Sequence, residues 1–306
     1  MPEFAQQQQF KTTEKIMAIP LAFAVVVVIW STTPLGIKWS GEEVGFLFGV
    51  LSRMLIGCII AMVVVKLARI QYSMSKRARR AYFASGIGIY TGMLFGYWGA
   101  SYIPSGWISV IWGFSPVLAG VLASIFLDEK ITLNRLLGLT LGITGLVIVF
   151  SHGLTLGKEV IFGSILILIG VFGQTGTAIW IKKINAGQHG LVMAAAGMLI
   201  ALPAFFLTWL IVDGEMPTEI PAKAGYSILY LSVFGSVIGF SLYFYLIHHL
   251  EASKVALVTF ITPVTALLIG NQINNEPLTP AVIIGTGFIL SGLASFEWGN
   301  RLFRRQ

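Results

Sequence analysis

The sequence predicts an all-α integral membrane protein with ten transmembrane helices, arranged as two inverted five-helix repeats. The composition, an internal repeat and the distribution of positive charge predict this class. Apolar residues make up 56% of the 306 residues and charged residues only 11%, whereas a soluble domain carries about a quarter charged residues. The mean hydropathy is +0.84. Most of the chain must therefore face lipid or other apolar helices.

One stretch of the chain occurs twice, as residues 86–145 and again, 147 positions later, as residues 233–292. The matching positions include Gly88 and Gly235, Gly92 and Gly239, Pro116 and Pro263, Ala119 and Ala266, Glu129 and Glu276, Thr132 and Thr279, Gly138 and Gly285, and Gly145 and Gly292. Glycine and proline have backbone requirements that are hard to replace, so their shared register predicts one unit built twice. A weaker similarity, between Trp30–Lys38 and Gln174–Lys182, extends the repeat at a slightly different offset.

Ten apolar segments follow one another, each near the ~20 residues needed to cross a bilayer. Residues 1–15 precede them as a polar, Gln-rich tail that we expect to be disordered and cytoplasmic. The first repeat then occupies residues 16–150, the second 151–298, and a basic cytoplasmic tail 299–306. The predicted spans are Ile16–Ile37, Val44–Val65, Tyr82–Ser101, Trp107–Leu127, Leu133–Phe150, Val160–Ile181, Gly190–Val212, Ala224–Ile247, Val255–Asn271 and Pro280–Trp298.

Lysine and arginine residues segregate between alternate loops. Sixteen lie on one side, only Lys38, Lys158 and Lys223 lie on the other, and Arg53 lies inside a span. Because cytoplasmic loops carry the excess of positive charge, both termini and the basic 66–80 loop are expected in the cytoplasm. The net charge of +7 thus reflects orientation in a lipid bilayer, and no nucleic-acid partner is expected.

The odd number of helices in each repeat means that the second repeat enters the membrane from the side opposite to the first. The two halves are then related by a pseudo-two-fold axis in the membrane plane, an arrangement suited to alternating access around a midplane site. Transport of a small-molecule substrate is therefore the leading hypothesis.

A family resemblance is carried by Phe114-Ser-Pro-Val-Leu-Ala and Phe126-Leu-Asp-Glu-Lys-Ile-Thr, with Ile261-Thr-Pro-Val-Thr-Ala as partner in the second half. This pattern resembles the paired EamA domains of the drug/metabolite transporter superfamily. The resemblance implies ten helices, cytoplasmic termini, a bacterial inner membrane, and a cavity lined by the first four helices of each repeat. Members export amino acids, metabolites or toxic cations. The second copy departs from the pattern with Asn275 and Pro277 in place of Asp128 and Lys130.

Arg53 is the cation inside a predicted span, about nine residues from its start and roughly a third of the way across. Arginine within hydrocarbon costs at least ~2.5–3.5 kcal/mol, so Arg53 should face the bundle interior or water. Its planar fork of donors suits a carboxylate or phosphate, which makes it a candidate substrate anchor. The alternative is a structural arginine held by backbone carbonyls or by Glu42 and Glu43.

Four aromatic residues lie deep in the predicted spans and are candidates for substrate binding: Trp30, Tyr90, Trp112 and Tyr243. Lipid contact or internal packing is the alternative for each. An aromatic lining favours an apolar, aromatic or cationic moiety in the substrate.

Pro116 and Pro263 lie in the middle of pseudo-equivalent spans, where proline removes a backbone hydrogen bond and bends the helix. They are interpreted as hinges, or alternatively as static kinks. The polar side chains nearest these bends are further candidates for substrate contact, or else are satisfied within their own helices: Ser115, Gln174, Thr259 and Thr262.

Two stripes of small residues, Gly88-x3-Gly92-x3-Gly96 and Gly138-x3-Gly142, allow close helix approach. Internal packing is the favoured interpretation, and a homodimer contact through the fifth helix is the alternative. Lys38 and Lys182 end matching helices, where snorkelling to the membrane interface explains both.

No metal, cofactor or catalytic group is expected. The four histidines lie in loops or at helix ends without metal-ligand spacing, Cys58 is the single cysteine, and no nucleophile–base constellation appears, so an enzyme is not predicted. No carboxylate lies in the middle of a predicted span, whereas ion-coupled carriers usually keep one there. This favours facilitated diffusion or exchange, with histidine or unwound backbone as other ways to bind a coupling ion.

Three functions are compatible with these patterns. The first is an inner-membrane exporter of small amphipathic metabolites such as amino acids, based on Arg53. The second is an efflux carrier for aromatic or cationic drugs, based on the aromatic residues. The third is a membrane scaffold or lipid-handling protein, which needs neither inverted repeats nor prolines in register and is disfavoured.

Overall fold

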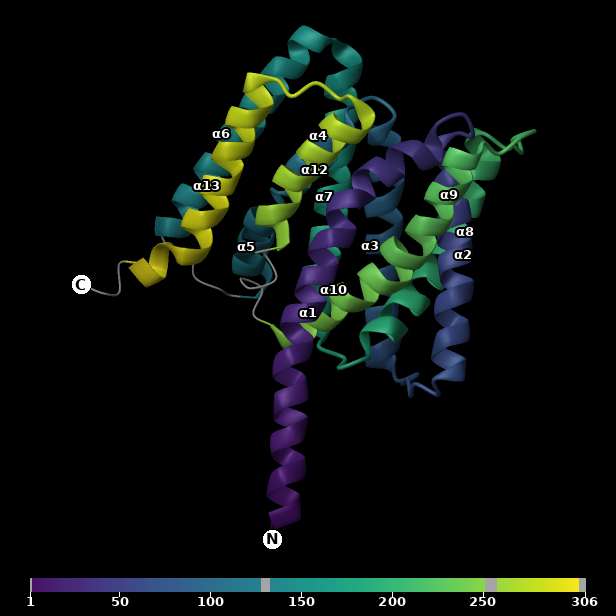
Figure 1. Ribbon diagram of the computed structural model, residues 1–306, viewed down its shortest axis with the longest axis vertical. Coiled ribbons are helices and arrows are strands. Elements are labelled where there is room, and N and C mark those ends of the chain that lie inside the picture. Colours follow the sequence, from purple (N-terminus) through teal and green to yellow (C-terminus); the bar gives the residue numbers. More distant parts are fainter. Residues whose placement is uncertain (1, 128–132, 251–257, 303–306) are drawn as a thin grey trace.

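The computed structural model describes residues 2–127, 133–250 and 258–302, and in these ranges the chain forms helices and loops with no β-strand (Figure 1). The helices are α1 (Pro2–Gly41), α2 (Phe46–Leu67), α3 (Lys76–Ala100), α4 (Ser105–Trp112), α5 (Ser115–Phe126), α6 (Leu133–Leu156), α7 (Lys158–Ile184), α8 (Gly190–Val212), α9 (Ala222–Tyr230), the π-helix η1 (Leu231–Gly239), α10 (Phe240–His249), α12 (Val258–Asn274) and α13 (Pro280–Leu302).

Within the described residues, six helical segments are long and apolar enough to cross a membrane. The other helices fall short for local reasons: α3 begins with a basic segment, α12 has 17 described residues, and the apolar parts of α6 and α13 cover only Leu136–Val149 and Pro280–Ser295. The protein is therefore a multi-pass, all-helical membrane protein. The six segments are Ile19–Gly41, Phe46–Leu67, Ser105–Phe126, Lys158–Ile184, Gly190–Val212 and Ala222–Leu246.

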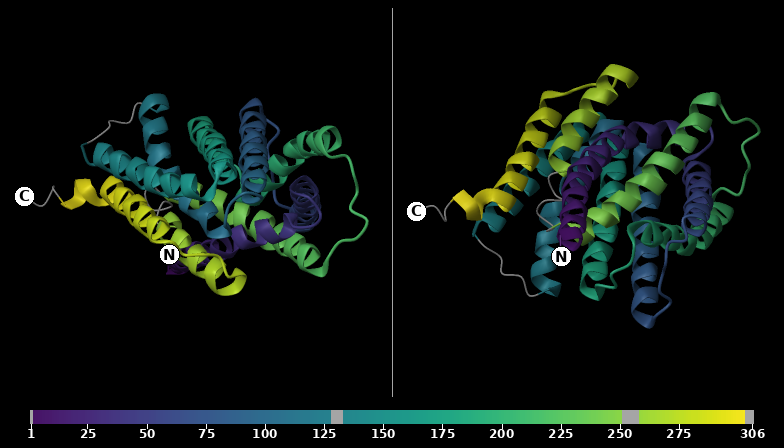
Figure 2. Two further views of the ribbon diagram at one scale, coloured as in Figure 1. Left: turned by 90° about the horizontal axis from the view of Figure 1, so that it is seen from above. Right: turned by 60° about the horizontal axis from the view of Figure 1, so that its bottom comes forward.

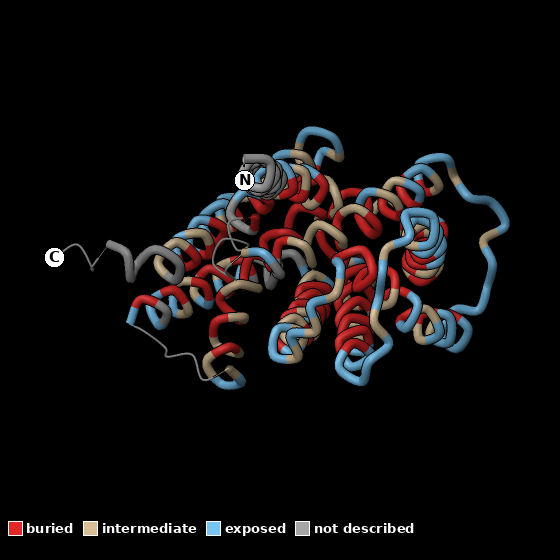
Figure 3. Tube along the Cα trace, turned by 90° about the horizontal axis from the view of Figure 1, so that it is seen from below, coloured by how far each residue is buried: buried red, intermediate tan, exposed pale blue. Residues whose placement is uncertain are grey.

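The helices form a central bundle and a peripheral pair. Helix α3 packs between α7 and α8, α2 lies against α8, and α1 lies against α12. Helices α6 and α13 lie side by side at one edge of the molecule (Figures 1 and 2). Buried residues follow the inward faces of the helices, and exposed residues follow the outward faces (Figure 3). Many exposed residues are large and apolar, as lipid contact requires.

Helix α1 begins at Pro2, contrary to the expectation that residues 1–15 are disordered. Residues 3–15 contain no glycine or proline and several Gln, Glu and Lys residues, which are good helix formers. Figure 1 shows this N-terminal part projecting away from the other helices. Two prolines, Pro20 and Pro34, lie inside α1.

The predicted fourth span is divided into α4 and α5, a division that the sequence analysis missed. Gly113 and Phe114 form the turn between them, and the Phe114 N–H donates to the carbonyl of Ile111, three residues back (3.1 Å). Pro116 has no N–H with which to continue the ladder. It therefore lies in the first turn of α5 and does not bend the middle of one helix, whereas Pro263 does lie inside α12.

Glycines bring the peripheral pair into backbone contact. A Cβ atom added at Gly145 of α6 would lie 2.5 Å from the carbonyl oxygen of Gly285 in α13. A Cβ added at Gly292 of α13 would lie 2.6 Å from the carbonyl oxygen of Gly138 and 2.8 Å from the N atom of Gly142. The Gly138–Gly142 stripe is thus used for packing within the chain.

Candidate functional site

A cavity of about 210 Å³ lies in the central bundle. Its walls come from α1, α2, α3, α4, α5, α7, η1, α10 and α12, so both halves of the chain contribute. The described parts of α6, α8 and α13 contribute no lining residue. The resemblance implies a cavity lined by the first four helices of each repeat, so the absence of α6 and α13 from the lining fits it. The absence of α8, which corresponds to the seventh predicted span, does not fit it.

Most of the residues selected from the sequence meet in this cavity. The first and the last of them are more than 200 positions apart in the sequence, and the fold brings all of them to one site. The selected residues that line the cavity are Trp30, Arg53, Trp112, Ser115, Pro116, Gln174, Tyr243 and Thr262.

Tyr90, a candidate for substrate binding with internal packing as the alternative, is not among the lining residues and packs between helices. Its hydroxyl lies 2.6 Å from Oγ1 of Thr208, and its ring meets Phe205 edge-on with centroids 5.0 Å apart. Tyr90 therefore joins α3 to α8. Pro263 does not line the cavity either, and the side chain of Thr259 lies outside the described residues.

Arg53 is 1% exposed, although it carries a charge. Its Nε donates to Oγ of Ser236 (2.9 Å), and its Nη1 lies 3.5 Å from the hydroxyl of Tyr97. No ion pair and no further hydrogen bond engages the guanidinium among the described residues, and Glu42 pairs instead with Lys223 (2.7 Å). Since a guanidinium has five N–H donors, Arg53 keeps donors on both terminal nitrogens for a ligand.

The side chain of Arg53 packs against the π-helix η1, which belongs to the second half of the chain. A Cβ added at Gly235 would lie 2.7 Å from Nη2 of Arg53, so the guanidinium rests directly on this glycine. Ser232 donates its hydroxyl to the backbone carbonyl of Arg53 (3.2 Å), and Ser236 binds Nε. Helices of π type are rare and occur frequently at functional sites.

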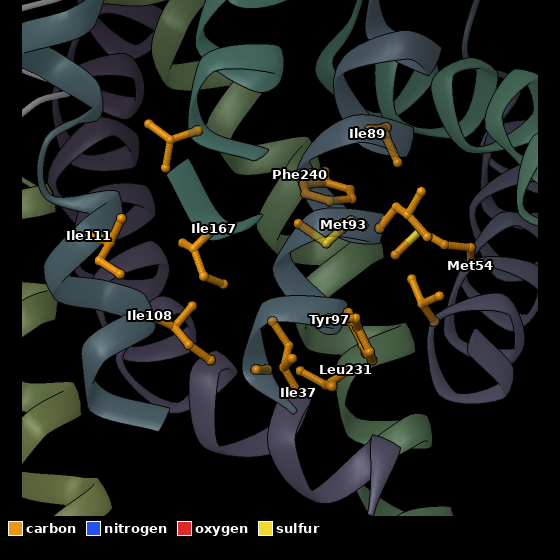
Figure 4. Close-up of a cluster of buried hydrophobic side chains, with 14 of the residues drawn as sticks. Ile37, Met54, Ile89, Met93, Tyr97, Ile108, Ile111, Ile167, Leu231 and Phe240 are labelled. Carbon is orange, nitrogen blue, oxygen red and sulfur yellow. The ribbon is translucent and has the colours of Figure 1, made fainter. Parts of the chain in front are cut away.

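The rest of the wall is largely aromatic and aliphatic. The rings of Trp30 and Tyr243 pack with centroids 5.2 Å apart. Met93, Ile108 and Phe240 belong both to the cavity wall and to the main buried cluster (Figure 4). An apolar part of a ligand would find contact area here.

Two polar features interrupt the apolar wall. The hydroxyls of Ser115 and Thr175 lie 2.8 Å apart and join α5 to α7. The side-chain oxygen of Gln174 is buried and has no hydrogen-bond partner among the described residues. The Gln174 amide therefore has unused hydrogen-bonding capacity, as Arg53 does.

Sequence reasoning missed several lining residues, among them Pro34, Thr175 and Lys182. Lys182 was assigned to the membrane interface, yet it is an exposed residue that lines one end of the cavity. The sequence contained one relevant indication, because Lys182 matches Lys38 in the repeat.

The two ends of the cavity differ in exposure. Ile37, Arg53 and Ile108 are at most 5% exposed and lie toward the end where α1 terminates. Lys182, in the last turn of α7, is exposed. Among the described residues, the lining is thus buried at the first end (the sealed end) and includes an exposed side chain at the second (the Lys182 end).

The charged residues that line the cavity are all positive within the described part of the chain, since no Asp or Glu is among them. A buried carboxylate does occur elsewhere: Glu276 is 8% exposed, and its Oε2 accepts from Oγ of Ser105 (2.8 Å) and from the N–H of Gly106 (3.2 Å). These contacts satisfy the carboxylate at the N-terminus of α4. The described charged residues in the cavity wall, Arg53 and Lys182, carry the charge that attracts an anion.

Membrane-spanning helices around a cavity that combines a buried cation with an apolar wall define a multi-pass membrane transporter. The chain belongs to the EamA-like transporter family, which matches residues 17–151 and 161–296 and so covers both halves. This match confirms the resemblance found in the sequence. The family of this chain and the relatives that it matches are transporters, so the protein is a transporter and not an enzyme.

Three proteins illustrate the similarity. The chain is 28% identical over 289 residues to the uncharacterized transporter YvbV of Bacillus subtilis (strain 168), covering 89% of both chains. It is 24% identical over 284 residues to an uncharacterized transporter of Archaeoglobus fulgidus, covering 89% of this chain and 96% of that one. A crystal structure with 16% sequence identity matches with a TM-score of 0.69, covering 93% of this chain and 99% of that one, which shows a shared fold.

Proposed function

We propose that the protein exports small amphipathic metabolites that carry a carboxylate, such as amino acids, by alternating access around the central cavity. One observation carries the proposal: Arg53 is buried in the cavity wall, retains unused donors and faces no lining carboxylate among the described residues. A guanidinium fork binds a carboxylate through two parallel hydrogen bonds. The aromatic wall would then hold the apolar part of the substrate.

The architecture that we propose has ten spans in two inverted five-helix repeats, and the cavity supports it. Its lining contains residues that match between the halves: Trp30 with Gln174 and Pro34 with Ala178, 144 positions apart, and Met93 with Phe240 and Ser115 with Thr262, 147 positions apart. Matched residues from both halves would face one cavity if that cavity lay on the pseudo-two-fold axis.

Two hydrogen bonds join corresponding helices of the two halves, although their second partners, Thr265 and Ser115, do not match in the repeat. Ser31 of α1 lies 2.5 Å from Thr265 of α12, and Thr175 of α7, which matches Ser31, lies 2.8 Å from Ser115 of α5. Each bond joins the proposed first helix of one repeat to the proposed fourth helix of the other. Arg53 breaks this symmetry, because no charged residue lies near the matching position, around Gly197–Ile200.

The orientation that we propose is multi-pass in a bacterial inner membrane, with both termini in the cytoplasm. Support comes from the basic residues at the junction of α2 and α3, on the side opposite to the end of α1. In this orientation the sealed end of the cavity faces away from the cytoplasm, and the Lys182 end faces the cytoplasm, where an exporter collects its substrate.

Efflux of aromatic or cationic drugs is the second candidate. The Trp30–Tyr243 pair and Trp112 favour an aromatic ligand. The buried charge of Arg53 disfavours a cation in the same cavity, since like charges repel strongly where water is excluded. An aromatic carboxylate satisfies both features.

A thermal-shift screen of purified protein, followed by exchange in proteoliposomes, tests the proposed function. The panel contains amino acids, aromatic and aliphatic carboxylates, and organic cations. We expect carboxylates to raise the melting temperature, because a ligand that binds only the folded state stabilises it by ~2.7 kcal/mol at a hundred times its Kd. If only organic cations stabilised the protein and were exchanged in proteoliposomes, drug efflux would be the supported function.

Gly235→Ala is expected to weaken carboxylate binding without unfolding the protein. The added methyl group would lie 2.7 Å from Nη2 of Arg53 and must displace the guanidinium. Loss of one charge-assisted hydrogen bond predicts about a tenfold rise in the Kd of the carboxylate. Isothermal titration calorimetry with the carboxylate that stabilises the wild type measures this change in Kd.

Gly225→Ala in α9 is the matched control, because its nearest contact would be an ordinary 3.7 Å. Its Kd is expected to equal that of the wild type. If the Kd of Gly235→Ala were unchanged as well, the contact between Gly235 and Arg53 would not determine the affinity for the ligand.

A further inference from the structure

Lys38 makes a hydrogen bond beside the sealed end of the cavity, next to the lining residue Ile37. Lys38, in the last turn of α1, donates from Nζ to the backbone carbonyl of Ile103 (3.0 Å). Ile103 is 1% exposed and lies in the connection between α3 and α4. Next to it, Nε1 of Trp39 donates to Oδ1 of Asn274 (3.0 Å), which ties α1 to α12. An ammonium group on a carbonyl is a charge-assisted bond, stronger than a neutral one.

The counterparts of this latch lie at the other end of the cavity. Lys182 stands 144 positions after Lys38, and Leu250 stands 147 positions after Ile103, which are the offsets of the matched lining residues. Both counterparts line the cavity. Leu250 is the C-cap of α10, so its carbonyl is among those that a helix leaves without an intrahelical partner. The second half therefore has a lysine and a backbone carbonyl at the positions that match Lys38 and Ile103.

We propose that Lys38 and Lys182 are two alternating latches of the transport cycle. In the state described here, Lys38 holds Ile103 and seals one end of the cavity. In the opposite state, Nζ of Lys182 donates to the carbonyl of Leu250 and seals the other end, and Lys38 releases Ile103. The inference rests on the proposed alternating access and gives its two ends specific closing contacts.

The test measures from which side of the membrane the cavity is accessible. Cys58, the single cysteine, is replaced by Ala, and Ala119 in the cavity wall is replaced by Cys as a reporter. A charged, membrane-impermeant thiol reagent then labels the reporter in right-side-out and inside-out vesicles. The ratio of the two labelling rates reports the balance of the two states.

The two lysine variants should move this ratio in opposite directions. Lys38→Met loses the present latch, so labelling from the extracytoplasmic side should rise about tenfold relative to the cytoplasmic side. Lys182→Met loses the other latch and should shift the ratio by a similar factor toward the cytoplasmic side. The double variant should return near the wild-type ratio, because the two effects oppose each other.

Matched variants separate a latch from a general charge effect. Lys183→Met removes the neighbouring lysine, which does not line the cavity, and should leave the ratio unchanged. Lys38→Arg and Lys182→Arg keep a cationic donor and should stay within about threefold of the wild type. Shifts in one direction, or a Lys182→Met ratio equal to that of Lys183→Met, would overturn the latch assignment.

Exchange of the panel solutes in the reporter background separates this inference from the proposed function. Exchange without opposite shifts in the two variants overturns the latches and leaves the transport function standing. Absence of exchange, with a reporter that reacts from one side in every variant, overturns alternating access and the latches with it.

Discussion

Replacing Arg53 by Ala is expected to abolish stabilisation by carboxylates and to lower their exchange by about 100-fold or more. Arg53 offers at least two charge-assisted hydrogen bonds to a carboxylate, and each contributes about 1.5–3 kcal/mol. Thermal-shift titration and proteoliposome exchange measure the two losses. The ligand-free variant should melt at or above the wild-type temperature, because the buried charge faces no counter-ion among the described residues and its desolvation costs stability.

Two further variants show whether the guanidinium itself matters. Arg53→Lys keeps the charge and loses the planar fork, so binding should fall between that of the wild type and that of Arg53→Ala. Arg69→Ala removes an exposed arginine from the basic loop and should bind like the wild type. If Arg53→Ala melted well below the wild type and kept its carboxylate response, Arg53 would be a structural residue.

Gly145→Ala is expected to destabilise the protein without altering ligand specificity. Its Cβ would lie 2.5 Å from the carbonyl oxygen of Gly285 and 2.7 Å from Cγ1 of Ile289, so α6 and α13 must move apart. Overpacking of this kind costs about 1–3 kcal/mol. The melting temperature in detergent, followed by tryptophan fluorescence, should fall accordingly.

Gly287→Ala is the control in α13, since nothing lies within 4 Å of an added Cβ. It should match or slightly exceed the wild-type melting temperature, because alanine is favoured over glycine in a helix. Equal melting temperatures for the two variants would contradict the close crossing of α6 and α13. If Gly145→Ala changed the molecular mass of the protein particle in detergent and left the melting temperature unchanged, Gly145 would lie in a dimer contact.

The internal repeat carried most of the predictable information about the fold. Glycines that match at one offset, such as Gly145 and Gly292, lie at helix crossings, since close backbone approach tolerates no larger residue. The repeat also placed matching residues in one cavity, as with Ser115 and Thr262. Arg53 could be selected because a charge inside an apolar span must find a partner or water.

Other features of the fold and of the cavity could not be predicted from the sequence. The helix that carries Tyr90 is buried on several sides, so hydropathy does not fix which side chain faces the cavity. Pro116 interrupts the backbone hydrogen bonds, but a proline alone does not distinguish a bend within one helix from a division into α4 and α5. The π-helix around Gly235, which packs against Arg53, has no marker in the local sequence. Lys182 stands at a helix end, where an interfacial residue and a cavity residue have the same sequence pattern.

The missing counterpart of Arg53 has a thermodynamic consequence. Arg53 lies on α2 and contacts Ser236 and Gly235 of the other half, so the alternating access proposed above would change the surroundings of its donors. The two end states of the proposed cycle would then bind the same solute with different dissociation constants. In a passive carrier this inequality must be balanced by the populations of the empty states, because the cycle as a whole performs no work. Such a protein cannot accumulate its solute against a gradient, yet it can saturate at a lower concentration on one face of the membrane than on the other.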